Sequence, residues 1–113
     1  MDIKERVVGG VSILDLSGKV VLGEGDAQVK ERIKDLLADG QRRILLNLAE
    51  VSYIDSAGLG SLISAYTTAR REGGSLKLVN LTKRIQDLLA ITKLITVFET
   101  FDSEAEALAS FGS

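Results

Sequence analysis

Hydrophobic positions near the start of the chain alternate with polar ones, as in strands that bury one face. Residues 3–8 and 11–16 form two such runs, and the glycine pair at 9–10 between them predicts a β-hairpin with a two-residue turn. The Ser-Gly pair at 17–18 is expected to end the second strand, and a short apolar piece at 20–22 follows it. The chain is therefore predicted to open with two antiparallel strands.

Further along, apolar residues recur every three or four positions, which is typical of helices that bury one face. Gly40 is well placed to end the first of these helices and the glycines at 73–74 to end the second. Ser103 followed by Glu106 is a capping-box pattern that predicts a fourth helix through Leu108. The predicted buried positions are Val29, Ile33, Leu36 and Leu37 in the first helix, Leu59, Leu62, Ile63 and Tyr66 in the second, and Ile85, Leu88, Leu89 and Thr92 in the third.

Further strands are predicted between these helices. Residues 44–48 are almost continuously apolar, as expected of a strand covered on both faces, and 75–79 and 95–98 are predicted as two more strands. Alternating strands and helices favour a mainly parallel sheet with right-handed crossovers. The predicted fold is α/β: an N-terminal β-hairpin, then repeated β-α units, giving a mixed sheet of about five strands with about four helices. One domain is predicted over residues 1–113.

The composition excludes several classes of function. The chain has no cysteine and no histidine, which rules out a thiolate nucleophile, a zinc–sulfur site and a Ser-His-Asp triad. A net charge of −2 without a basic stripe argues against a nucleic-acid partner. No apolar run is long enough for a membrane span, and the charged first residues are unlike a secretory signal, so we expect a cytoplasmic protein without membrane insertion. Binding is favoured over catalysis, and no catalytic residue, metal ligand or cofactor is predicted.

The most informative segment is 51–61, between the most apolar strand and the second helix. Sites in open α/β sheets form at the carboxyl ends of parallel strands. Asp55 and Ser56 stand at the predicted helix start, whose N–H groups and dipole favour an anionic group. Gly58 and Gly60 remove side chains from the first turn and let another molecule approach Ser56. Each costs about 1 kcal/mol relative to alanine, so a purely structural helix start would gain by dispensing with them.

The Asp55-Ser56 pair also has an ordinary interpretation as a helix cap, because both residue types are favoured at the N-cap. The residues alone leave two alternatives open, a simple cap and a serine that is modified.

The run Ile54-Asp55-Ser56-Ala57-Gly58-Leu59-Gly60 resembles the signature of the anti-sigma factor antagonist group of STAS domains (sulfate transporter and anti-sigma factor antagonist). In that group Asp-Ser is followed by Ser, Thr or Ala and then by Gly-Leu-Gly. The flanking segments 44–53, 71–78 and 84–92 resemble the family as well, so the resemblance covers almost the whole chain.

This resemblance implies a protein that switches partners under the control of phosphorylation. The unphosphorylated domain would bind an anti-sigma factor that is also a serine kinase of the histidine-kinase-like ATPase fold, and so release a sigma factor. Phosphorylation of Ser56 would end the binding, and a serine phosphatase would restore it. The family also implies a monomer when free. The residues implied to contact the partner are Asp55, Ser56, Ala57, Gly58, Leu59 and Gly60.

One position departs from the family pattern. Many antagonists carry an aspartate three residues after a glycine that follows the second strand, whereas here Gly18 is followed at that distance by Val21. Glu24 or Asp26 would supply the acid from a shifted position. Alternatively, Asp26 caps the first helix and the neighbouring glycines form a loop. This departure bears on the identity of the partner more than on the fold.

The aromatic residues are predicted to divide between surface and core. Tyr53 is predicted to be an interface residue, since tyrosine is enriched in binding hot spots. Tyr66 lies on the apolar helix face and is predicted to pack in the core. Phe98, Phe101 and Phe111 are predicted to hold the last strand and helix against the core.

Two other functions stay open on the sequence. Because Val21 stands where many antagonists carry an aspartate, a STAS signalling or scaffold domain with a non-sigma output is an alternative. A transporter-associated small-ligand or lipid-system domain is disfavoured by the intact Asp55-Ser56 pair. A stand-alone enzyme is the least favoured, because the chain lacks histidine, cysteine and a convergent acid–base pair.

Overall fold

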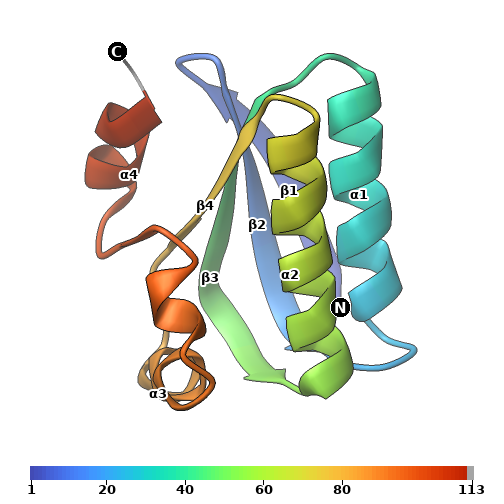
Figure 1. Ribbon diagram of the computed structural model, residues 1–113, viewed down its shortest axis with the longest axis vertical. Helices are drawn as coiled ribbons and strands as arrows, with labels where there is room; N and C mark the ends of the chain where they lie inside the picture. The colour runs from blue at the N-terminus through green and yellow to red at the C-terminus, as the bar shows by residue number, and fades with distance from the viewer. Residues whose placement is uncertain (112–113) are drawn as a thin grey trace.

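A five-stranded sheet with helices on both faces organises the computed structural model, which describes residues 1–111 (Figure 1). The α/β architecture predicted from the sequence is confirmed. The elements in chain order are β1 (Asp2–Val8), β2 (Val11–Val20), α1 (Asp26–Ala38), β3 (Arg43–Ile54), α2 (Ser56–Arg71), β4 (Ser75–Val79), α3 (Lys83–Ile91), the 3₁₀ turn η1 (Leu94–Thr96), β5 (Thr100–Phe101) and α4 (Glu104–Phe111).

The strands lie in the order β1-β2-β3-β4-β5, so each strand pairs with the next one in the chain. β1 and β2 are antiparallel, and all later pairs are parallel. The predicted hairpin is confirmed, with Gly9 at φ 57° and Gly10 at φ 81°. Positive φ at both turn positions is what a two-residue turn compatible with strand twist requires.

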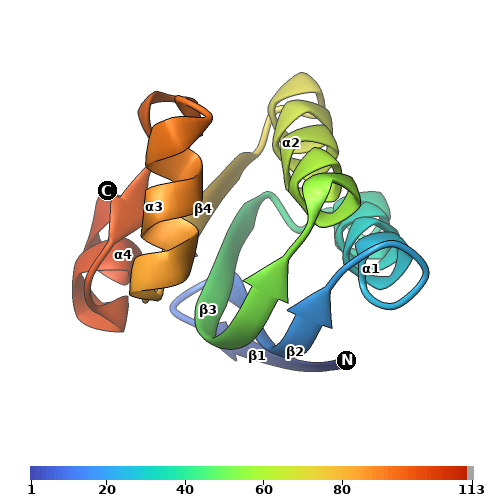
Figure 2. The ribbon, with the colours of Figure 1, turned by 90° about the horizontal axis from the view of Figure 1, so that it is seen from below.

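The sheet separates two hydrophobic clusters, because successive side chains of a strand point to opposite faces. The larger cluster packs α1, α2 and α3 against one face, and the smaller one packs α4 against the other. Figure 2 shows α1 and α2 side by side over the same face of the sheet. The smaller cluster consists of Val11, Ile13, Leu45, Val79 and Ala107, with Phe101, Leu108 and Phe111 packed against it.

Two strands are longer than the sequence pattern predicted. β2 does not end at 17–18 but continues to Val20, with shifts of register next to Ser17 and between Gly18 and Lys19. β3 extends past Leu48 to Ile54 because this continuation of β2 supplies it with a hydrogen-bonding partner. The carboxyl ends of the two strands therefore lie side by side, next to the start of α2.

The prediction of a strand at 95–98 is wrong. This segment contains η1, and the fifth strand is Thr100–Phe101. Leu94, Ile95 and Phe98 pack on the large cluster while Val97 is 40% exposed, and that spacing fits a helical turn better than a strand. The contacts of this short apolar run with the core decided its conformation.

Most predicted core positions in the helices are buried, Tyr66 and Leu88 are partly buried against the large cluster, and two positions are exposed. Ile63 is 36% exposed, and Thr92 is an exposed residue at the carboxyl end of α3 whose hydroxyl donates to the carbonyl of Leu88 at 2.8 Å. Tyr66 packs edge-on against Phe98 with 5.2 Å between ring centroids, so its predicted core role is confirmed. The three phenylalanines also pack against the two clusters as predicted.

The start of α4 is held to the sheet by Arg6 of β1. Its guanidinium donates to Asp15 at 2.6 and 3.0 Å and to Glu104 at 2.7 Å, and Asn47 donates to Asp15 at 2.9 Å. The hydrogen bonds from Arg6, followed by the one from Asn47, hold the pKa of Asp15 below its usual range.

We expect this pairing to make stability depend on pH. The folded-state pKa of Asp15 lies below its unfolded value of about 3.9, so the stabilisation is complete above that value and is lost as pH falls through the folded-state pKa. Urea unfolding between neutral and acid pH should show a shallower loss of unfolding free energy in Asp15→Asn than in the parent. Glu31→Gln, at an exposed carboxylate, should keep the parental slope. Equal slopes in the parent and Asp15→Asn would contradict the assignment.

Candidate functional site

The candidate site lies where β2 and β3 end and α2 begins, and Asp55 organises it. Asp55 has an extended backbone (φ −94°, ψ −175°) and is the N-cap of α2. Its Oδ1 accepts the N–H of Gly58 at 2.8 Å, which satisfies one of the amide groups left free at a helix start. The cap predicted on the Asp55-Ser56 pair is therefore present, and it is made by the aspartate.

The second carboxylate oxygen of Asp55 reaches the loop between β2 and α1. Oδ2 accepts the backbone N–H of Leu22 at 3.0 Å, and the N–H of Asp55 itself lies 3.4 Å from the carbonyl oxygen of Val20. The N–H groups of Gly58 and then Leu22 hold the pKa of Asp55 below its usual range, so it is a carboxylate at neutral pH. One side chain thus caps a helix and fixes the neighbouring loop against it.

Two substitutions of Asp55 should separate these roles. Asparagine is a good N-cap but has a single acceptor oxygen, so Asp55→Asn should keep the bond to Gly58 and lose the one to Leu22. Asp55→Ala should lose both and have the lower thermal unfolding midpoint of the two. Amide hydrogen exchange at Leu22 should be faster than in the parent in both variants. An unchanged exchange rate at Leu22 in Asp55→Ala would show that the carboxylate does not hold the loop.

Ser56 is the first residue of α2, and it is exposed. Because Asp55 makes the cap, the Ser56 hydroxyl has no capping role and forms no hydrogen bond within the described chain of residues 1–111. The amide groups and the dipole of the helix start lie next to it. The arrangement leaves a serine oxygen available to another molecule, beside a carboxylate.

The residues after Ser56 do not all face outward. Gly60 is exposed, and a Cβ built on it meets nothing within 4 Å, as the sequence interpretation required. Gly58 is buried, and a Cβ there would lie 1.8 Å from the carbonyl oxygen of Val20. The interpretation that a structural helix start would gain by dispensing with both glycines is therefore wrong for Gly58. Leu59 is only 9% exposed and belongs to the large cluster, whereas Ala57 is half-buried at the surface.

The loop between β2 and α1 places the two candidate acids differently. Glu24 is exposed, while the Oδ1 of Asp26 accepts the N–H of Gly23 at 3.0 Å inside the loop. The N-cap of α1 is Gly25, so the alternative that Asp26 caps this helix is wrong by one residue, although its side chain does order the loop. Leu22, to which no sequence pattern assigned a role, is 76% exposed next to Asp55.

Tyr53 lies three residues before Ser56 and is 45% exposed, as a surface role requires. The guanidinium carbon of Arg84 lies 6.0 Å from the centroid of its ring. Tyr53 and residues of α3 line a hollow of about 340 Å³, and one of them, Ile91, is 80% exposed. Neither Arg84 nor Ile91 could be connected with Tyr53 from sequence spacing, because α3 is brought there by the fold.

The structure was also searched for a metal-binding cluster and for a membrane-spanning helix. Within residues 1–111 no cluster of three or more acidic side chains is arranged to bind a metal ion. No helix in this range has both the length and the apolar character needed to cross a membrane.

The fold and the site define a small α/β domain. It presents an exposed serine and neighbouring apolar side chains where the strands β2 and β3 end. The STAS domain family model matches residues 2–107. The anti-sigma-B factor antagonist of Listeria monocytogenes is 33% identical over 94% of this chain and 91% of its own length. The chain therefore belongs to the STAS domain family, and curated relatives of this similarity are anti-sigma factor antagonists.

Solved structures agree with this assignment. A Thermotoga maritima protein described as an anti-sigma factor antagonist superimposes with a TM-score of 0.89, at 26% identity, over 96% of this chain and 92% of its own. The Bacillus cell fate determinant SpoIIAA in its phosphorylated form superimposes with a TM-score of 0.75 over 97% of this chain and 99% of its own. At 18% identity, that second similarity concerns the fold.

Proposed function

We propose that this protein is an anti-sigma factor antagonist whose binding is switched off by phosphorylation of Ser56. The observation that carries the proposal is that Asp55 alone caps α2 and leaves the Ser56 hydroxyl exposed and without a hydrogen bond to residues 1–111. A serine that served only as a cap would instead have its oxygen engaged by the helix amides.

In the proposed cycle the unphosphorylated form binds an anti-sigma factor that is also a serine kinase of the histidine-kinase-like ATPase fold, and a sigma factor is released. The kinase then transfers the γ-phosphoryl group of ATP to the oxygen of Ser56, which loses its proton, and ADP leaves. A serine phosphatase hydrolyses the phosphate ester and restores the binding form. This chain supplies the substrate hydroxyl and the docking surface.

The surface that contacts the partner is proposed to centre on Ser56. Tyr53, three residues before Ser56, and Leu22, bonded through its N–H to Asp55, contribute exposed apolar area, and Gly60 leaves the next turn of α2 open. Glu24 supplies the exposed acid of the neighbouring loop in place of the family's aspartate, whose position is taken by Val21. Gly58 and Leu59 act from inside, by fixing the position of this surface.

The proposal agrees with the physical chemistry of a phosphate at this place. The ester adds about −1.5 to −2 charges at neutral pH, directly beside the carboxylate of Asp55. In the free protein, water and the amide groups of the helix start can stabilise this charge. In a complex the same charge is desolvated, and it is repelled by Asp55 and by acidic groups or nucleotide phosphates of the partner.

The proposal is tested by affinity capture from a lysate of the native host, with the parent, Ser56→Ala, Ser56→Asp and Ser52→Asp as baits. Ser52→Asp is the matched control, because Ser52 is an exposed serine near the end of β3, four residues before Ser56, and it receives the same substitution. We expect the parent, Ser56→Ala and Ser52→Asp to capture a serine kinase of the histidine-kinase-like fold, and Ser56→Asp to lose it. If the parent captures no such kinase, or Ser56→Asp captures it as well as the parent does, the proposal is wrong.

A further inference from the structure

The groove between α1 and α2 carries three cations and no carboxylate. Its hollow has a volume of about 230 Å³. Lys30 and Lys34 lie four residues apart on α1 and therefore on one side of that helix, and Arg71 lies at the end of α2. None of the three forms a salt bridge with any of residues 1–111. This is an uncompensated positive groove on a chain whose net charge is −2.

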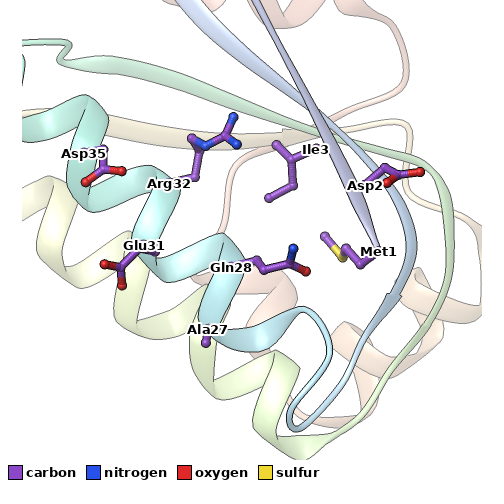
Figure 3. A pocket seen from close by; sticks show the side chains of 8 residues that line it. All are labelled: Met1, Asp2, Ile3, Ala27, Gln28, Glu31, Arg32 and Asp35. Carbon is purple, nitrogen blue, oxygen red and sulfur yellow. The ribbon is translucent and has the colours of Figure 1, made fainter.

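Two of the three acidic residues of α1, Glu31 and Asp35, lie on its other flank. The third, Asp26, lies one turn before Lys30, does not line the groove, and accepts the N–H of Gly23 at 3.0 Å. Glu31 and Asp35 line a separate hollow of about 540 Å³ between α1 and β1, where they alternate with Gln28 and Arg32 (Figure 3). Arg32 is itself paired there with Glu5 at 3.5 Å. Like charges at the spacing of Lys30 and Lys34 repel each other, so the segregation is unfavourable until an anion occupies the groove.

The groove also offers neutral hydrogen-bond donors. Ser64 and Thr68 lie four residues apart on α2, half-buried in the lining, and neither hydroxyl forms a hydrogen bond with the part of the chain that the structure describes. The contrast is Ser61, whose hydroxyl donates to the carbonyl of Ala57 at 3.1 Å, as helical serines often do. Two hydroxyls therefore remain free to donate into the groove.

The floor of the groove is apolar. Ile33 is 1% exposed and Ala65 is 3% exposed, so one wall of the hollow excludes water. Charge-assisted hydrogen bonds strengthen where the local dielectric is low. The hollow is smaller than the pockets that hold whole cofactors, which are roughly 300–1,000 Å³, and therefore fits a compact anion.

We propose that this groove binds a small tetrahedral oxyanion of the phosphate class, held by Lys30, Lys34 and Arg71 and oriented by the hydroxyls of Ser64 and Thr68. The site is distinct from the Ser56 hydroxyl and does not depend on its phosphorylation. Inorganic phosphate and a phosphate monoester share the required chemistry, and the two are separated by the titrations below.

The test is an NMR titration of the ¹⁵N-labelled full chain with sodium phosphate, at constant pH and at an ionic strength held constant with sodium chloride. We expect saturable amide shifts centred on Lys34, Ser64 and Thr68. Lys34→Gln should weaken binding about tenfold, since it removes one charge-assisted contact, and Lys34→Gln combined with Arg71→Gln should abolish it. A parallel titration with O-phosphoserine identifies the source: tighter binding of the ester indicates a monoester, and equal or weaker binding indicates free phosphate.

Two controls make the result specific. Lys83→Gln removes an exposed cation from α3 and should leave the affinity unchanged, as should Ser56→Ala. The three cationic side chains are at the surface, so circular dichroism should show the variants folded. Shifts that grow linearly without saturation, or an affinity that is the same in Lys34→Gln/Arg71→Gln and in Lys83→Gln, would overturn the proposal.

Discussion

Replacing Gly58 with alanine is expected to destabilise the protein by about 3 kcal/mol, although alanine is the better helix former. The new Cβ would lie 1.8 Å from the carbonyl oxygen of Val20 and 2.8 Å from its carbonyl carbon. Both atoms belong to the backbone at the end of β2, so no side-chain rotation can relieve the clash. The start of α2 must then move away from β2, together with Ser56.

Gly60→Ala is the matched control, because it makes the same substitution two residues further along the same helix. Apart from Gly60 itself, its chain neighbours and the nearby backbone of its own helix, no atom lies within 4 Å of the position that the new Cβ would occupy. The change should therefore stabilise the protein by about 0.5–1 kcal/mol. Urea unfolding of the two variants and the parent measures both effects. If Gly58→Ala proves as stable as Gly60→Ala, the close approach of α2 to β2 is not a requirement of the fold.

Phosphorylation of Ser56 is expected to weaken binding of the captured kinase several hundred-fold, which corresponds to about 3–4 kcal/mol. The physical reason is the added charge at a desolvated interface next to Asp55, which is already a carboxylate at neutral pH. Isothermal titration of the purified kinase with the phosphorylated and unphosphorylated proteins measures this ratio. A ratio near one would contradict the switch even where the kinase is the correct partner.

The same modification should change the free protein little. Ser56 is exposed and its hydroxyl holds no contact with residues 1–111 that the phosphate would break. Amide chemical shifts should therefore change near Ser56 and in the loop at 21–25, which Asp55 contacts through Leu22. Large shifts in α4, on the opposite face of the sheet, would indicate a conformational mechanism in place of electrostatic blocking.

Local sequence patterns correctly predicted the elements that are determined by a few neighbouring residues, such as a turn or a helix cap. The glycine pair at 9–10 predicted the hairpin, and Ser103 with Glu106 predicted the start of α4, where the hydroxyl of Ser103 accepts the N–H of Glu106 at 3.2 Å. Failures occurred where distant contacts outweigh local preference. Residues 94–98 are apolar enough for a strand, but packing against the core bends them into η1. β2 runs past a Ser-Gly pair, and there it pairs with the extended part of β3, so the two strands stabilise each other's continuation.

For the candidate site too, some features could be predicted from the sequence and others required the structure. The order of Asp55 and Ser56 before an apolar helix was sufficient to locate the candidate site, but it left a simple cap and a modified serine as alternatives. The resemblance of residues 54–60 to the STAS signature implied the phosphorylation of Ser56. The structure then assigned the cap to Asp55 and left Ser56 free, a distinction that needs the positions of the carboxylate and of the Gly58 amide. The bond from Leu22 to Asp55 joins residues 33 positions apart, and no local pattern encodes it.

Hydrophobic periodicity, capping residues and turn residues act over a few positions, so the features they control could be predicted from the chain alone. These features are the α/β class, the hairpin, the four helices and the place of the candidate site at the carboxyl end of β3. The packing of Gly58 against Val20, the hold of Asp55 on the neighbouring loop, and the groove shared by Lys30, Lys34 and Arg71 became visible only in three dimensions. They depend on how separate elements approach one another, and such distances are set by the packing of the whole core.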